Sequence, residues 1–163
     1  MTGTAGEQAV TQPECEFCRD VVEPEDLLWA SEYVVARLGR PHHKGHVEVV
    51  FVRHEEDLTT LTDRERDAFF DDMIYVAEVL KRILQPDVVN YQMLGNWIPH
   101  LHWHIYPRFR SDPDFGNPMV IPLRDEPFEP QLVAEEEVAA LRRDLRQFEH
   151  DRCPHCQRRA RRR

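Results

Sequence analysis

The sequence lacks both a long apolar run and an apolar leader. A membrane-spanning helix needs roughly 18 or more consecutive apolar residues, and no such run occurs, so no membrane span is expected. Residues 1–14 are polar and lack the apolar core of a secretory signal, so we expect a cytoplasmic protein by default. With 163 residues, the chain suits one domain with a sizeable core.

The C-terminal segment lacks acidic residues and is rich in arginine. Residues 152–163 hold six arginines and no acid, which leaves 15 basic against 30 acidic residues elsewhere, a formal charge of −15. A body this acidic repels a nucleic-acid backbone, so no nucleic-acid partner is expected. The arginine-rich end could bind one, but a run of like charges is more often a solvated tail.

Cysteine is scarce, and its four copies fall into two Cys-x-x-Cys pairs, Cys15 with Cys18 and Cys153 with Cys156. In a cytosolic chain such pairs indicate metal binding or redox chemistry rather than structural disulfides. A thioredoxin-like redox site would lie at the start of a helix in a βαβ unit, and neither pair has that setting. Metal binding is therefore favoured.

Hydrophobic periodicity predicts an α+β fold, with helices segregated from a mostly antiparallel sheet. A capping box, Thr62 to Glu65, predicts the start of the clearest helix, and Pro86 is expected to end it. The almost wholly apolar segment 47–52 is expected to be a central strand. Strands are predicted within 33–38, 47–52, 88–94 and 98–108, and helices within 59–84 and 131–148. We expect an arm at 1–13, one domain at 14–150 and a tail at 151–163.

Three histidines, His100, His102 and His104, alternate with apolar residues in the stretch Ile98–Arg108. Alternation of period two is typical of a β-strand and would place the imidazoles on one face and the apolar side chains on the core face. Packing alone gives no reason for such a row, because each buried imidazole needs a hydrogen-bond partner. The row instead suits a shared chemical task, with a nucleophile, a metal ligand and a hydrogen-bonding partner.

This stretch resembles the signature of the histidine triad (HIT) superfamily. The flanking segments Leu94-Gly95-Asn96 and Pro107-Arg108 resemble those of its bacterial diadenosine tetraphosphate hydrolase-like branch. The resemblance covers roughly residues 15 to 125. It implies a five-stranded sheet with two main helices and a homodimer. It also implies a nucleotide hydrolase or nucleotidyl transferase that acts on adenosine nucleotide esters, phosphoramidates or dinucleoside polyphosphates.

The resemblance also implies roles for individual residues. His102, the middle histidine, would attack the α-phosphorus and form a nucleotidyl-histidine, assisted by His104 and by His46, which takes the place of the family's fourth histidine. Asn96 and Trp97 precede the triad where many relatives bind phosphate through Gln and Ser or Thr. An indole cannot replace a hydroxyl, although its N–H can donate one hydrogen bond.

A second departure concerns the ribose. Many relatives carry an acid near the position of Leu38, and the segment Arg37–Pro41 has none. Arg40, Lys44 and Arg108 could favour a more anionic substrate, although such cations are more often solvated at the surface. Among them, Arg108 is predicted to bind the substrate. His42 and His43 are expected to be exposed loop residues.

Some bacterial relatives bind a structural zinc ion, and the resemblance assigns its four ligands to Cys15, Cys18, His54 and His100. Such a site would fix the strand that carries the nucleophile. Three alternatives remain open, and one of them is that the cysteines bind no metal. All four cysteines could form one thiolate site, or His150, Cys153, His155 and Cys156 could form a separate site.

The sequence therefore predicts a zinc-containing HIT-fold enzyme with a small-molecule nucleotide substrate. Two other functions are alternatives to hydrolysis. Phosphate in place of water as the second acceptor would make the protein a dinucleoside polyphosphate phosphorylase. Alternatively, the chain is a non-catalytic zinc-containing nucleotide-binding module.

Overall fold

The computed structural model describes residues 15–19, 25–122 and 126–147. The predicted arm, the tail and both of its cysteines lie outside the described residues. In chain order the elements are α1 (Glu16–Arg19), β1 (Leu27–Ala30), β2 (Val34–Leu38), β3 (Val47–Phe51), the 3₁₀ turn η1 (Leu58–Thr60), α2 (Asp63–Leu84), β4 (Val88–Gln92), β5 (His102–Arg108) and α3 (Glu135–Arg146). Within the described ranges, no helix has both the length and the apolar character to cross a membrane.

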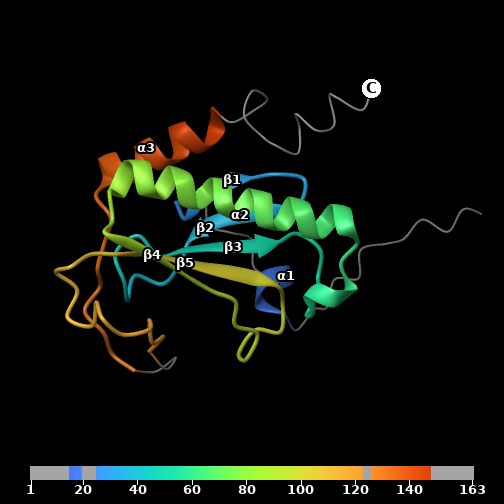
Figure 1. Cartoon of the computed structure of the whole chain (residues 1–163), viewed down its shortest axis with the longest axis horizontal. Coiled ribbons are helices and arrows are strands. Elements are labelled where there is room, and N and C mark those ends of the chain that lie inside the picture. The colour runs from blue at the N-terminus through green and yellow to red at the C-terminus, as the bar shows by residue number, and fades with distance from the viewer. Residues whose placement is uncertain (1–14, 20–24, 123–125, 148–163) are drawn as a thin grey trace, which may run out of the picture.

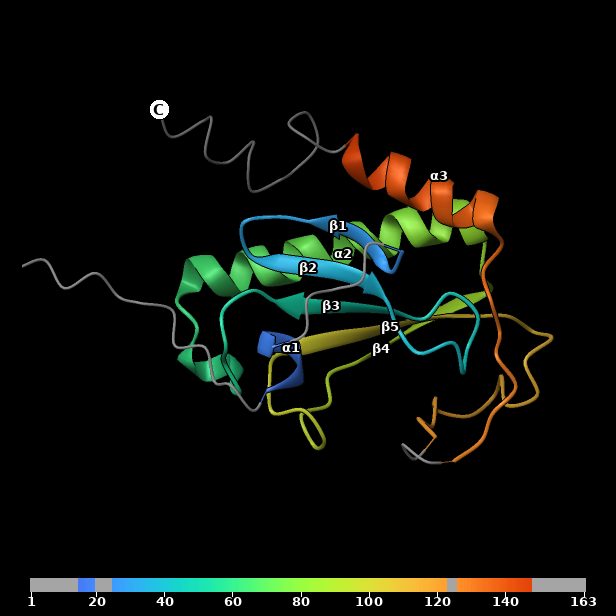
Figure 2. The same ribbon diagram turned by 180° about the vertical axis from the view of Figure 1, so that it is seen from behind.

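Five antiparallel strands form one sheet in the order β1-β2-β3-β5-β4. Helix α2 packs along one face of this sheet and α3 packs on α2 and β1, whereas the short α1 lies on the other face (Figure 1; Figure 2). The predicted α+β class with a five-stranded antiparallel sheet is confirmed. The central position of β3 is confirmed as well, and all five of its residues are buried.

Strand β5 and helix α3 begin about four residues later than predicted, at His102 and Glu135, and two further boundaries also differ. The segment 27–38 contains β1 as well as β2, and β1 carried too weak an alternation to be recognised. The predicted helix 59–84 is divided, because Thr62 has an extended backbone as the N-cap of α2. The expected capping box is present there, with the Thr62 hydroxyl and the Glu65 carboxylate each bonded to the other residue's backbone N–H.

The sheet has a core face and an open face because strand residues alternate. Ala36, Val49 and Ile105 are fully buried on the core face, beneath α2. On the open face, residues in register form a row across neighbouring strands: Arg37 pairs with Glu48, which pairs with His104. Residues paired in register share a face, so the sheet itself brings these three side chains together.

Substitution of Leu80 tests how much the packing of α2 on the sheet contributes to stability. Leu80→Ala is expected to lower the free energy of unfolding by about 2–5 kcal/mol, because the side chain is fully buried in the core. Leu132→Ala makes the same change at a residue that is 73% exposed and should shift stability by no more than about 0.5 kcal/mol. Urea unfolding of both variants measures the difference, and equal values would contradict the assigned core.

Candidate active site and metal centre

His102 and His104 lie on the open face of β5, with their Nε2 atoms 3.0 Å apart. The His102 Nδ1–H donates to the carbonyl oxygen of His100 at 2.6 Å. A carbonyl only accepts hydrogen bonds, so this contact fixes the proton on Nδ1 and leaves the lone pair of His102 on Nε2. Leu101 and Ile105 are buried on the opposite face, as the alternation predicted.

His100 departs from the predicted row because it precedes β5 rather than belonging to it. Its Nε2–H donates to the carbonyl oxygen of Phe51 at 2.7 Å, and its Nδ1 faces Cys15 and Cys18. The three histidines are thus divided between two adjacent sites. His102 and His104 face a pocket, whereas His100 faces the cysteines.

His46 joins the pair from the residue just before β3. Its Nε2 lies 3.0 Å from the His104 Nδ1, and its Nδ1 lies 3.2 Å from the carbonyl oxygen of Arg40. The structure therefore brings together the three histidines predicted for catalysis. They form one chain of hydrogen-bonded rings, in the order His46, His104, His102.

Gly39 leaves the space that His46 occupies. A Cβ atom at residue 39 would lie 2.2 Å from the His46 Nδ1. Gly39→Ala is therefore expected to displace the His46 ring, to cost about 1–3 kcal/mol of stability and to reduce any activity that needs this ring. Gly116→Ala is the matched control, because a Cβ there meets no atom within 4 Å. Thermal unfolding and turnover of both variants make the comparison, and equal behaviour would contradict the close packing.

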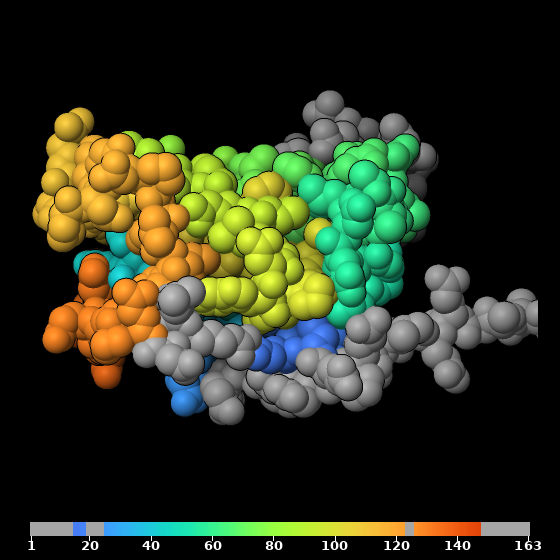
Figure 3. All heavy atoms as spheres, turned by 90° about the horizontal axis from the view of Figure 1, so that it is seen from below, coloured from blue at the N-terminus to red at the C-terminus, as the bar shows by residue number. Residues whose placement is uncertain are grey.

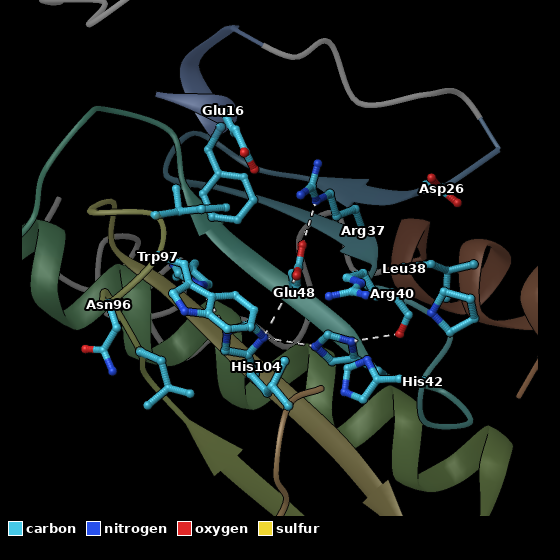
Figure 4. Close-up of a pocket in the computed structure, with 18 residues that line it drawn as sticks. Glu16, Asp26, Arg37, Leu38, Arg40, His42, Glu48, Asn96, Trp97 and His104 are labelled. Carbon is cyan, nitrogen blue, oxygen red and sulfur yellow. Dashed lines mark hydrogen bonds and ion pairs between the residues drawn. The ribbon is translucent and has the colours of Figure 1, made fainter. Parts of the chain in front are cut away.

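The histidine chain opens into a cavity of about 890 Å³ on the open face of the sheet (Figure 4). His46, His102 and His104 line it, as do Asn96 and Trp97 from the loop before β5. Figure 3 shows this yellow-green loop next to the blue α1 on the face turned away from α2. The Trp97 side chain is 48% exposed, so its ring is accessible to a ligand.

Arg108 does not line this cavity, so the prediction that it binds substrate is corrected. Its side chain is 1% exposed and bonds the Asp112 and Asp114 carboxylates, with further bonds to Asn90 and Asn117. A guanidinium has five N–H donors, and these partners use them to hold the segment after β5. Arg108 is therefore a structural residue.

His42 and His43 are buried rather than exposed, at 8% and 3%. His43 contacts the carbonyl oxygen of Pro107 through Nε2 at 2.5 Å. The rings of both residues pack against Tyr106. The expectation of exposed loop residues was wrong because the loop between β2 and β3 folds back onto β5.

Three acids line the cavity although the segment around Leu38 has none: Glu16, Asp26 and Glu48. Glu48 is 8% exposed, accepts a bond from the Arg37 Nε at 2.9 Å and approaches the His104 Nδ1 to 3.9 Å. Burial raises the pKa of Glu48, and the Arg37 guanidinium opposes that rise. Sequence reasoning missed this residue, although one acid within an otherwise apolar strand was a usable signal.

Burial lowers the pKa of His42 to about 4 and that of His104 to about 3. Both groups titrate near 6.5 in the unfolded chain. Below pH 6.5 the unfolded state therefore binds more protons, so the free energy of unfolding falls as the pH falls toward 4. The slope is expected to reach about 1.4 kcal/mol per pH unit for each histidine.

Urea unfolding at pH 7 and pH 5, with metal content checked at both, measures this slope. His42→Gln should show a smaller loss between the two pH values, because it removes one of the histidines whose pKa burial lowers. Equal stability of the unmodified protein at both pH values would contradict the buried neutral histidines.

Cys15, Cys18, His54 and His100 form a second cluster beside the cavity, with one ligand atom from each within 4.8 Å of the others. The Cys18 Sγ lies 3.2 Å from the His54 Nδ1, and the Cys15 Sγ lies 3.4 Å from the His100 Nδ1. Ligands at about 2.0–2.3 Å from a tetrahedral ion stand roughly 3.3–3.8 Å apart. The four residues therefore fit one zinc-sized ion.

The surroundings of the cluster also suit a metal. Metal-bound histidines usually donate their other ring N–H to a carbonyl or carboxylate. His100 does so to Phe51, and the His54 Nε2 lies 3.5 Å from a Glu56 carboxylate oxygen. A Cys₂His₂ set fills all four tetrahedral positions, which is the pattern of a structural site.

Helix α1 links the cluster to the cavity. Phe17 stands between the two cysteines in sequence, and its ring centroid lies 4.8 Å from that of His102 and 5.6 Å from that of His100. The Arg37 guanidinium lies 4.7 Å from the same ring. An ion held by Cys15 and Cys18 would therefore also hold one wall of the cavity.

The HIT domain family model matches residues 21–111 of this chain. The chain belongs to the HIT family. Proteins of the HIT family are generally nucleotide hydrolases or transferases, although some are non-catalytic. The matched residues include His46, His100, His102 and His104.

Relatives and solved structures agree with this membership. An uncharacterised HIT-like protein of Methanocaldococcus jannaschii is 31% identical over 105 residues, which cover 60% of this chain and 81% of that protein. A histidine triad protein of Sinorhizobium meliloti has a similar fold, with a TM-score of 0.61 at 21% identity over 75% of this chain and 87% of that one. A zinc-bound HIT family protein of Mycobacterium smegmatis has a TM-score of 0.54 at 22% identity, over 76% and 85%.

Proposed function

We propose that this HIT protein transfers or hydrolyses the nucleotidyl group of an adenosine nucleotide ester, phosphoramidate or dinucleoside polyphosphate through a covalent intermediate on His102. The observation that carries the proposal is the state of the His102 ring. Its Nδ1–H is held by the His100 carbonyl, so the Nε2 lone pair points into a nucleotide-sized cavity. A neutral imidazole in a fixed tautomer is a good nucleophile near neutral pH.

The reaction then runs in two displacements. The His102 Nε2 lone pair forms a bond to the α-phosphorus while the bond to the leaving group breaks and its electron pair departs with that group. The His104 Nε2–H, which contacts His102 in the free protein, is placed to turn toward the leaving group or a phosphate oxygen. Water then attacks the phosphorus and gives up a proton to solvent, and the phosphorus–nitrogen bond breaks with its electron pair returning to the His102 Nε2, which releases the nucleotide.

Asn96 and Trp97 are proposed to bind the substrate. The Asn96 amide can donate hydrogen bonds to phosphate oxygens, which agrees with its position on the rim of the cavity. The half-exposed Trp97 ring can stack on a nucleobase or donate one bond. Arg108 is not included, because it is fully engaged elsewhere.

Cys15, Cys18, His54 and His100 are proposed to hold a structural zinc ion. The donor set and its geometry support this assignment, and the similar Mycobacterium smegmatis protein is described as zinc-bound. Zinc would supply no chemical step here. It would hold His100, and so keep in place the carbonyl that orients the nucleophile.

We further propose a cytoplasmic homodimer. Strand β4 is an edge strand of the sheet, and its Val88 and Tyr91 side chains are 47% and 45% exposed. An exposed apolar edge strand is suited to pairing with a second copy. Sedimentation of the purified protein measures the assembly, and a monomer at micromolar concentration would contradict it.

Turnover in ¹⁸O-labelled water tests the reaction. The protein is incubated with diadenosine tetraphosphate and, separately, with an AMP phosphoramidate, and the products are examined by mass spectrometry. A hydrolase places ¹⁸O in the released AMP. Formation of ADP only in the presence of inorganic phosphate would indicate a phosphorylase instead. Nucleotide binding without turnover of either substrate would favour the non-catalytic module.

A further inference from the structure

The chain of histidine rings is one proton short of complete hydrogen bonding. It has four links: from the Arg40 carbonyl to His46, from His46 to His104, from His104 to His102, and from His102 to the His100 carbonyl. Each link needs one proton. A neutral imidazole carries one N–H, so three rings supply only three.

The position of the missing proton follows from the two ends of the chain. Both ends are carbonyl oxygens, so the Nδ1 atoms of His46 and His102 must carry protons. Their Nε2 atoms are then lone pairs, and His104 has one N–H for two contacts. When His104 donates to His102, the lone pairs of the His46 Nε2 and the His104 Nδ1 face each other across 3.0 Å. Two facing lone pairs in a buried site repel unless a cation lies between or beside them.

The Glu48 carboxylate lies beside the two facing lone pairs. Glu48 is in register with His104, and its Oε1 approaches the His104 Nδ1 to 3.9 Å, while its Oε2 is held by Arg37 at 2.9 Å. One ligand atom each from His46, Glu48 and His104 lies within 4.8 Å of the others, and all three residues are buried. Figure 4 shows Glu48 and His104 turned toward each other beneath Arg37.

The charges around the cluster allow a cation. Arg37 and Arg40 line the cavity and oppose one, but Glu16, Asp26 and Glu48 line it too. With neutral histidines, these five side chains sum to −1. Two imidazoles and one carboxylate are the protein ligands of many zinc sites that keep open positions for water or substrate.

We propose that His46, Glu48 and His104 bind one divalent transition-metal ion, such as Zn²⁺, at a second site that is distinct from the cysteine cluster. The ion takes the two facing lone pairs and the free Glu48 oxygen, and its remaining positions open into the cavity. It replaces the missing proton, because the coordinated His104 Nδ1 leaves its Nε2–H to donate to His102. The site does not depend on the proposed reaction.

Cobalt titration of the metal-stripped full-length protein tests the proposal, because Co²⁺ reports its ligands by absorption. A site with cysteine ligands gives thiolate-to-cobalt charge-transfer absorption in the near ultraviolet. We expect this band to saturate first and a further equivalent of Co²⁺ to add visible absorption without it. Any binding by the cysteines of the C-terminal segment would carry the thiolate band and so be separable.

Glu48→Gln supplies the decisive variant, since it preserves size but removes the charged ligand. We expect it to weaken the thiolate-free Co²⁺ site by roughly 100-fold or more while the thiolate band is retained, which also reports an intact fold. Asp26→Asn removes another cavity carboxylate and should leave the site unchanged. No thiolate-free Co²⁺ in the unmodified protein, or equal binding in Glu48→Gln, would overturn the proposal and assign the place to a proton.

Discussion

Replacing His102 by alanine is expected to reduce turnover by about 10⁴-fold or more, because it removes the proposed nucleophile. The His102 Nε2 carries the lone pair that faces the cavity, and its tautomer is fixed by the 2.6 Å bond to the His100 carbonyl. His104→Ala should cost less, about 10²–10⁴-fold, because it removes proton donation but leaves the nucleophile. Steady-state turnover of the better of the two test substrates measures both losses.

The intermediate itself separates the two roles. Protein quenched during turnover with a nucleotide labelled in its α-phosphate should retain the label in the unmodified form, and a His102→Ala sample should retain none. His155→Ala is the control, since no part of the reaction is assigned to that histidine. Full turnover by His102→Ala, or label held equally by both forms, would move the chemistry to another residue.

The parts of the site that could be predicted are those that local sequence spacing fixes. Alternation in the triad stretch placed His102 and His104 on one face of a strand, and the capping box placed the start of α2 at Thr62. These features depend on neighbours within a few residues. Alternation along a strand, or a threonine three residues before a glutamate, is therefore enough to reveal them.

The parts that could not be predicted depend on strand register and on how the loops fold back onto the sheet. Glu48 looked like an exception in an apolar strand, and only its pairing with Arg37 and His104 gives it a role. Arg108 looked like a free cation beside the triad, but its partners come from the following loop and from β4. Register across three strands is a tertiary property, which hydrophobic periodicity alone does not specify.

The largest structural effect is expected from His54→Gln, which removes one of the four proposed zinc ligands. A glutamine cannot replace the imidazole nitrogen as a zinc ligand, so we expect the protein to lose the zinc bound at this cluster and a large part of its stability. Turnover should fall too, although His54 does not line the cavity, because an ion bound there would hold His100 behind the proposed nucleophile and α1 with Phe17 against His102.

Cys153→Ser separates the Cys₂His₂ arrangement from the four-thiolate arrangement, and loss of zinc from both variants would indicate a separate C-terminal site as well. In the Cys₂His₂ arrangement His54 is a ligand and Cys153 is not, so only His54→Gln should release zinc. In the four-thiolate arrangement the result is reversed. Zinc content by mass spectrometry and thermal unfolding are measured on the same samples of both variants. Retained zinc in His54→Gln with loss in Cys153→Ser would reject the Cys₂His₂ centre and leave the position of His100 to its bond with Phe51.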